Sequence, residues 1–85
     1  MRVVVVYKDE TDYARQVDTF LFEFKRLTGH ELEVIDPESR DGVQFCGTYD
    51  IMQYPTIIAL SDDGQVQNKW VGLPLPTMSE VSYYV

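Results

Sequence analysis

The sequence predicts a single small α/β domain in which helices pack against a mixed sheet. Residues 3–6 form an unbroken β-branched run, which is typical of a strand buried on both faces. An amphipathic segment follows this run at once, and a strand followed directly by a helix favours a layered α/β architecture. Later in the chain, an Asp-Gly turn signal joins two further apolar segments. The 85 residues suffice for one domain, which we place at 1–85.

The first helix is predicted over residues 11–28. Thr11 is its expected N-cap, and Gly29 stands where a left-handed C-cap is needed. Phe22 lies off the main apolar stripe and is expected to pack against a neighbouring loop. The stripe itself consists of the positions at helical spacing, namely Tyr13, Val17, Phe20, Leu21, Phe24 and Leu27.

The second strand is predicted over residues 31–36, where Pro37 stops it. Because a long helix connects it to the first strand, we expect the two strands to be parallel. Apolar and polar residues alternate at its start, which indicates an edge position. A short second helix is then predicted within residues 39–49, although Gly42 and Gly47 weaken the helical pattern.

A hairpin is predicted next, with strands over residues 54–60 and 65–71. The turn between them, Ser61-Asp62-Asp63-Gly64, contains the Asp-Gly pair that suits the positive φ angles of a tight turn. These two strands are therefore expected to be antiparallel.

The chain then predicts a short last helix, with Thr77 as its N-cap. Trp70 on the preceding strand is expected to complete the core together with Tyr83 and Tyr84. A helix this short would leave part of the sheet uncovered, and that surface would be open to formation of a homodimer.

Composition and charge argue against several classes of partner. The chain has 14 acidic and 7 basic residues, for a net charge of −7, and no basic run that could neutralise phosphates. We therefore expect neither a nucleic acid nor a membrane as partner. The apolar run at the N-terminus is too short for a signal peptide. Cys46 is the only cysteine, so no disulfide framework is expected, and we predict a cytoplasmic protein.

The segment Tyr49-Asp50-Ile51-Met52-Gln53-Tyr54-Pro55-Thr56-Ile57-Ile58 resembles the thioredoxin-like superfamily, which includes thioredoxins and glutaredoxins. The predicted order β-α-β-α-β-β-α and the spacing to the hairpin turn and Gly72 are similar to that family too. The resemblance covers almost the whole chain and implies a four-stranded mixed sheet flanked by helices. It also implies that Pro55 follows a cis peptide bond and that the backbone of Tyr54 binds an extended peptide or glutathione, as strand addition does.

The other half of the family's site is different here. The family's Cys-x-x-Cys lies after the first strand, at the start of the first helix, where the helix dipole lowers the pKa of the first thiol. The equivalent positions fall on Thr11 and Ala14 or on Asp12 and Arg15, depending on the gap. Neither alignment contains sulfur, so dithiol exchange by the usual mechanism is excluded. The acidic residues in this stretch would also oppose the carboxylates of glutathione.

Three single residues have both a functional and a structural interpretation. Cys46 is the one possible redox group, yet it is expected on the second helix, away from the usual active-site end, where a buried cysteine packs as a small hydrophobe. Thr11 is close to the position in the fold at which glutathione transferases use a hydroxyl to stabilise a thiolate. A role as helix N-cap fully explains a threonine at this position, however. His30 has no second histidine or cysteine at ligand spacing, so we expect no metal and no cofactor.

Tyr7, Tyr13 and Tyr54 are predicted to converge at the active-site end of the fold. They form either a partner-binding surface with Pro55 and Thr11 or a layer of packing beneath the loop. Our leading hypothesis is a non-catalytic module that binds a protein or peptide through the proline loop.

The first alternative is an atypical redox or glutathione-binding protein that uses Cys46 alone, which would make the chain similar to a thiol-disulfide oxidoreductase. A second alternative is a structural subunit that functions only in an oligomer.

Overall fold

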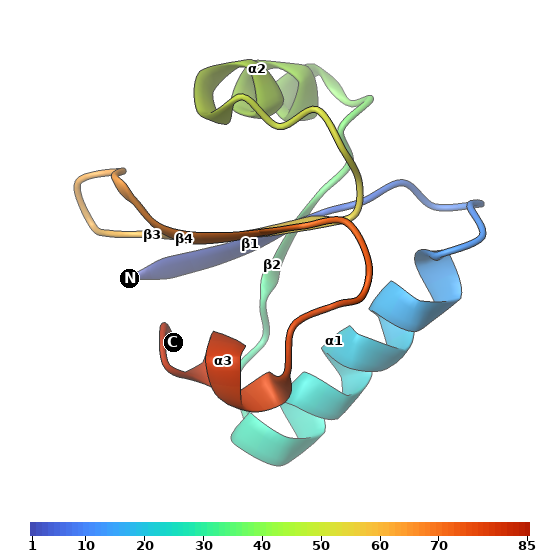
Figure 1. Cartoon of the computed structure of the whole chain (residues 1–85), viewed down its shortest axis with the longest axis vertical. Helices are drawn as coiled ribbons and strands as arrows, with labels where there is room; N and C mark the ends of the chain where they lie inside the picture. The colour runs from blue at the N-terminus through green and yellow to red at the C-terminus, as the bar shows by residue number, and fades with distance from the viewer.

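The computed structural model describes residues 1–85 as one α/β layered unit (Figure 1). The sheet has four strands in the order β2-β1-β3-β4. As the sequence predicts, β1 pairs in parallel with β2, and β3 and β4 are antiparallel. The structure adds an antiparallel pair between β1 and β3. In chain order the elements are β1 (Arg2–Val6), α1 (Ala14–Thr28), β2 (Glu33–Ile35), α2 (Arg40–Tyr49), β3 (Thr56–Leu60), β4 (Val66–Val71) and α3 (Met78–Ser82).

The core lies on both faces of the two central strands, β1 and β3. Figure 1 shows α2 on one side of the sheet and α1 with α3 on the other. Successive side chains of a strand point to opposite faces, so Val3 and Val5 pack beneath α1 and α3, whereas Val4 and Val6 pack beneath α2. This two-sided burial explains why β1 is an unbroken β-branched run.

Helix α1 begins later than predicted. It starts at Ala14, its N-cap is Tyr13, and no side chain caps it, so the prediction of Thr11 as the N-cap is wrong. The Thr11 hydroxyl instead donates a hydrogen bond to the carbonyl of Lys8 at 2.8 Å. Such local bonds compete with the helical ladder and delay the start of the helix. The other end agrees with the prediction, because Gly29 caps the helix at φ +77°.

Two apolar side chains of α1 are not in the core. Phe22 is 68% exposed and Leu27 is 61% exposed, so the expected loop packing of Phe22 and the placement of Leu27 in the buried stripe are wrong. The buried face is centred on Val17, Phe20 and Phe24. At about 100° per residue, Phe22 is about 200° from Phe20 and points to solvent.

Helix α2 has the short span that the sequence predicts. The Ser39 hydroxyl caps it by accepting a hydrogen bond from the Gly42 amide at 3.0 Å. A Cβ atom on Gly42 would lie 1.8 Å from the carbonyl oxygen of Asp36. The glycine that weakens the helical pattern in the sequence is therefore required by the close approach of two backbone segments.

The C-terminal part of the chain agrees with the prediction in outline. The hairpin turn has Gly64 at φ +84°. Thr77 caps α3, and its bonds with Glu80 form a complete capping box. Tyr84 packs on Trp70, but Tyr83 is 81% exposed, so its expected place in the core is wrong. None of the helices has both the length and the apolar character needed to cross a membrane.

Candidate partner-binding site

The loop between α2 and β3, residues 50–55, is held at both ends. At its start Ile51 is buried, and its amide donates to the Cys46 carbonyl at 2.9 Å. At its end Pro55 is buried, and the Thr56 hydroxyl donates to the Gln53 carbonyl at 2.6 Å. The peptide bond between Tyr54 and Pro55 is cis. The loop is thus positioned by the core rather than by its own exposed residues.

The main chain of Tyr54 has no hydrogen-bond partner in the protein. The ladder between β3 and β4 continues one residue past β3, where the Gly72 amide donates to the Pro55 carbonyl at 2.8 Å. It stops there, and neither the amide nor the carbonyl of Tyr54 takes part in a backbone or side-chain hydrogen bond. Both groups of Tyr54 are therefore available to a partner or to water.

The Tyr54 ring is half-buried against the apolar cluster beneath α2. Its outer side faces a cation, since Lys8 Nζ lies 5.4 Å from the ring centroid. Burial raises the pKa of its hydroxyl, and the neighbouring Cys46 thiol adds to this effect. Cys46 is on α2 as predicted, but it lies beside Tyr54 and not away from this end of the fold. It is only 8% exposed.

The other two predicted tyrosines, Tyr7 and Tyr13, hold the segment that follows β1. Tyr7 is buried in the core, and its hydroxyl donates to Asp18 Oδ1 at 2.6 Å. Burial is the larger cause of a raised pKa of the Tyr7 hydroxyl, and the hydrogen bond to Asp18 raises this pKa further. The Tyr13 hydroxyl accepts a hydrogen bond from the Lys8 amide at 3.3 Å and lies close enough to Tyr54 to raise its pKa. These side chains fix the segment that carries Lys8.

Sequence reasoning missed two exposed apolar residues at this end of the fold. Met52 is 81% exposed, and Leu73 is half exposed in the loop that follows β4. The two loops are adjacent, because Gly72 bonds to Pro55 and lies against the Gln53 side chain. An apolar residue within a Gly- or Pro-containing loop is the signal that could have identified both. We call Lys8, Met52, Gln53, Tyr54 and Leu73 the proline-loop surface.

No protein-family model matches the sequence, and no curated protein does either. Solved structures do match. Thioredoxin 1 from Thermosipho africanus superposes with a TM-score of 0.68 at 15% identity, over 99% of this chain and 89% of that one. The fold is thioredoxin-like. A structure described as a malarial protein gives the same TM-score of 0.68 at 10% identity, over 96% of this chain and 89% of its own. At these identities the likeness establishes the fold alone.

Within the thioredoxin-like fold, the segment from the end of β1 to the start of α1 contains no sulfur. Residues 9–15 read Asp-Glu-Thr-Asp-Tyr-Ala-Arg, and the one thiol of the chain is Cys46 on α2. Thr11, in this segment, uses its hydroxyl on the Lys8 carbonyl. No side chain near the start of α1 is therefore placed as a thiol nucleophile.

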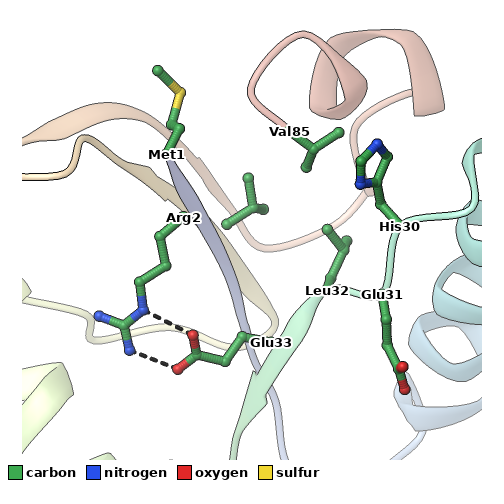
Figure 2. Close-up of a pocket in the computed structure, with 8 residues that line it drawn as sticks. Met1, Arg2, His30, Glu31, Leu32, Glu33 and Val85 are labelled. Atoms are coloured by element: carbon green, nitrogen blue, oxygen red, sulfur yellow. Dashed lines mark hydrogen bonds and ion pairs between the residues drawn. The ribbon is translucent and has the colours of Figure 1, made fainter.

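A cavity of about 400 Å³ lies away from the proline-loop surface, where β1 and β2 begin (Figure 2). Its charged wall is neutralised, because the Arg2 guanidinium binds both carboxylate oxygens of Glu33, at 2.8 and 2.6 Å. His30 and Glu31 also line it, but no cluster of three metal-ligating side chains occurs in the structure. This cavity offers no metal-ligand set.

Proposed function

We propose that this thioredoxin-like chain is a non-catalytic module that binds an extended segment of a partner protein at the proline-loop surface. The observation that supports the proposal most is the unpartnered main chain of Tyr54, next to exposed apolar side chains. An extended peptide that runs past this residue would form main-chain hydrogen bonds to its amide and carbonyl, as in strand addition.

The side chains around Tyr54 would supply the rest of the contact. Met52 and Leu73 offer apolar area that is in water in the free protein, and burying it favours association. The Tyr54 ring adds a rigid aromatic surface of the kind enriched at the centres of interfaces. Lys8 Nζ is 3.8 Å from Glu38, an exposed pair that a partner carboxylate can displace at small cost.

The position of Cys46 favours binding over redox chemistry. A thiol must reach a disulfide sulfur to exchange with it, and Cys46 is enclosed by the cluster beneath α2, next to Tyr54. A redox function that uses Cys46 alone would need this cluster to open first.

The experiment compares two substitutions that each replace an exposed apolar side chain by aspartate, one on the proline-loop surface and one on α2. Peptides selected from a displayed library for binding to the domain are titrated calorimetrically against Met52→Asp and Val43→Asp. Both side chains are exposed, Met52 by 81% in the loop and Val43 by 61% on α2, so both variants are expected to fold. We expect Met52→Asp to weaken binding by about tenfold or more, the size of an interface hot spot, and Val43→Asp to leave it within about twofold. Equal effects of the two variants would contradict the proposal.

A further inference from the structure

A cavity of about 370 Å³ is lined by residues of β4, of α3 and of the segment that follows α3. Helix α3 lies on the face of the sheet opposite to α2 (Figure 1). The walls of the cavity combine three aromatic rings with one carboxylate. The proline-loop surface does not include any of its residues, and nothing in the proposed function uses it. The lining residues are Asn68, Trp70, Ser79, Glu80, Tyr83 and Tyr84.

The ring of Tyr84 lies between those of Trp70 and Tyr83 and is nearly perpendicular to each of them. Trp70 and Tyr84 have centroids 5.6 Å apart and planes at 74°, and Tyr84 and Tyr83 have centroids 5.0 Å apart and planes at 77°. Both contacts are edge-type rather than stacked, and all three residues line the same cavity. The Asn68 amide donates to the Tyr84 hydroxyl at 3.3 Å and holds the central ring in place.

A carboxylate lies beside the rings. Glu80 Oε2 accepts a hydrogen bond from Trp70 Nε1 at 3.3 Å, and its Oε1 accepts from the Thr77 amide at 3.1 Å. The bonds from Thr77 lower the pKa of Glu80, so the carboxylate is ionised at neutral pH. The capping box thus fixes a negative charge at the edge of the aromatic walls.

No cation of the chain itself neutralises this site. None of the five ion pairs in the structure involves Glu80. Lys69 is the basic residue of β4, and its Nζ donates a hydrogen bond to the Tyr49 carbonyl at the end of α2. The two cation–π contacts of the protein lie elsewhere, at Phe45 and Tyr54. With a net charge of −7, the molecule as a whole also attracts cations.

We propose that the cavity formed by Trp70, Tyr83, Tyr84 and Glu80 binds a methylated ammonium group. Faces of aromatic rings attract cations through the ring quadrupole, and several rings at angles surround such a group better than one. A bare lysine ammonium is strongly hydrated. Methyl groups weaken that hydration and give the cation an apolar surface that packs against the rings, while Glu80 offsets its charge.

The test uses choline as the cationic probe and 3,3-dimethylbutan-1-ol, its uncharged isostere, as the matched control ligand. Trp70 is the only tryptophan, so its fluorescence and its indole N–H signal report on this cavity alone. We expect choline to give a saturable change and the neutral isostere to bind about tenfold more weakly or worse. Equal binding of the two ligands, or no saturable change with choline, would overturn the proposal.

Two variants separate the cavity from the rest of the surface. Tyr83→Ala removes an 81% exposed ring of the cavity, and Phe22→Ala removes a 68% exposed ring of α1. We expect choline binding to weaken about fivefold in Tyr83→Ala and to stay unchanged in Phe22→Ala, because one cation–π contact is lost only in the first. Equal binding by the two variants would overturn the assignment of the site.

A peptide with one trimethyllysine identifies the source of the group. Binding about tenfold tighter than that of choline assigns the site to a modified side chain of a partner, and equal binding assigns it to a free small molecule. Tighter binding of the peptide and equal binding of the two ligands both support the proposal that the cavity binds a methylated ammonium group. If choline gives no saturable change, the proposal is wrong whether or not the peptide binds.

Discussion

Tyr7, which follows β1 directly, contacts α1 through both its buried ring and its hydroxyl. Its ring packs in the core, and its hydroxyl donates to Asp18 on the first turns of the helix. Burial keeps the phenol neutral in the folded state, and the charges of Asp18 and Asp9 act in the same direction, so the pKa of Tyr7 is raised. The contact thus links pH to the stability of the sheet–helix interface.

This raised pKa predicts a loss of stability in alkaline solution. Above about pH 10 the unfolded chain releases the Tyr7 proton while the folded chain keeps it. The unfolded state then binds fewer protons, so the free energy of unfolding falls as pH rises further. Tyr7→Phe should cost about 1 kcal/mol at pH 7 through the lost hydrogen bond, and should flatten this alkaline fall. Urea denaturation between pH 7 and 11 measures both; an unchanged alkaline slope in Tyr7→Phe would contradict the assignment.

Cys46 gives a second prediction at this scale. Its thiol is 8% exposed beneath α2, so a thiol reagent should modify it only when the structure opens. We expect modification in native buffer to be slower than in urea by about a thousandfold or more, in line with a marginally stable small domain. Rapid native labelling would instead favour the single-thiol redox alternative.

The exposed aromatic residues show what sequence periodicity leaves out. Helical spacing placed Val17, Phe20 and Phe24 correctly, because each faces the sheet. It could not place Tyr83, because a helix as short as α3 has no complete repeat from which to read a face. The proline-loop surface was likewise predicted only in part. Tyr54 lay in a family-like motif, whereas Met52 and Leu73 belong to loops, which have no periodicity.

At the scale of the element, α2 contains two glycines with opposite roles. A Cβ on Gly42 would lie 1.8 Å from the Asp36 carbonyl oxygen, whereas a Cβ on Gly47 would meet nothing within 4 Å. The sequence shows only that both glycines weaken a helix. The close approach at Gly42 depends on the turn that precedes α2, so only the three-dimensional structure separates the two.

This contrast predicts opposite effects of one substitution. Gly42→Ala should lower the free energy of unfolding by about 2 kcal/mol or more, because the backbone must move to admit the methyl group. Gly47→Ala should raise it by about 0.5–1 kcal/mol, because alanine loses less backbone entropy in a helix. Chemical denaturation of the two variants provides the comparison, and each serves as the control for the other. A stabilising Gly42→Ala would contradict the geometry.

The strands were predictable because their signals are local. Val3–Val6 is apolar throughout because both faces of β1 are covered, and the turn ending at Gly64 fixes the direction of β4. The start of α1 was not predictable, because the Thr11–Lys8 bond competes with a cap that suits the sequence equally well. Element order thus follows from pattern, whereas element ends depend on side-chain bonds.

At the scale of the whole molecule, the two faces of the sheet carry separate surfaces. The half-buried Tyr54 belongs to the cluster beneath α2, and the aromatic cavity at Trp70 belongs to the face covered by α1 and α3. The two proposed sites therefore have no side chain in common. The proposed function rests on the unpartnered main chain of Tyr54 and not on the aromatic cavity.

Amide hydrogen exchange at Tyr54, followed residue by residue with and without a selected peptide, tests the central claim most directly. The Tyr54 amide has no partner in the free protein, so it should exchange rapidly. If the peptide adds as a strand, protection of this amide should increase by about tenfold or more, while the Gly72 amide, already bonded to Pro55, changes little. Peptide binding that leaves the Tyr54 amide unprotected would contradict the account.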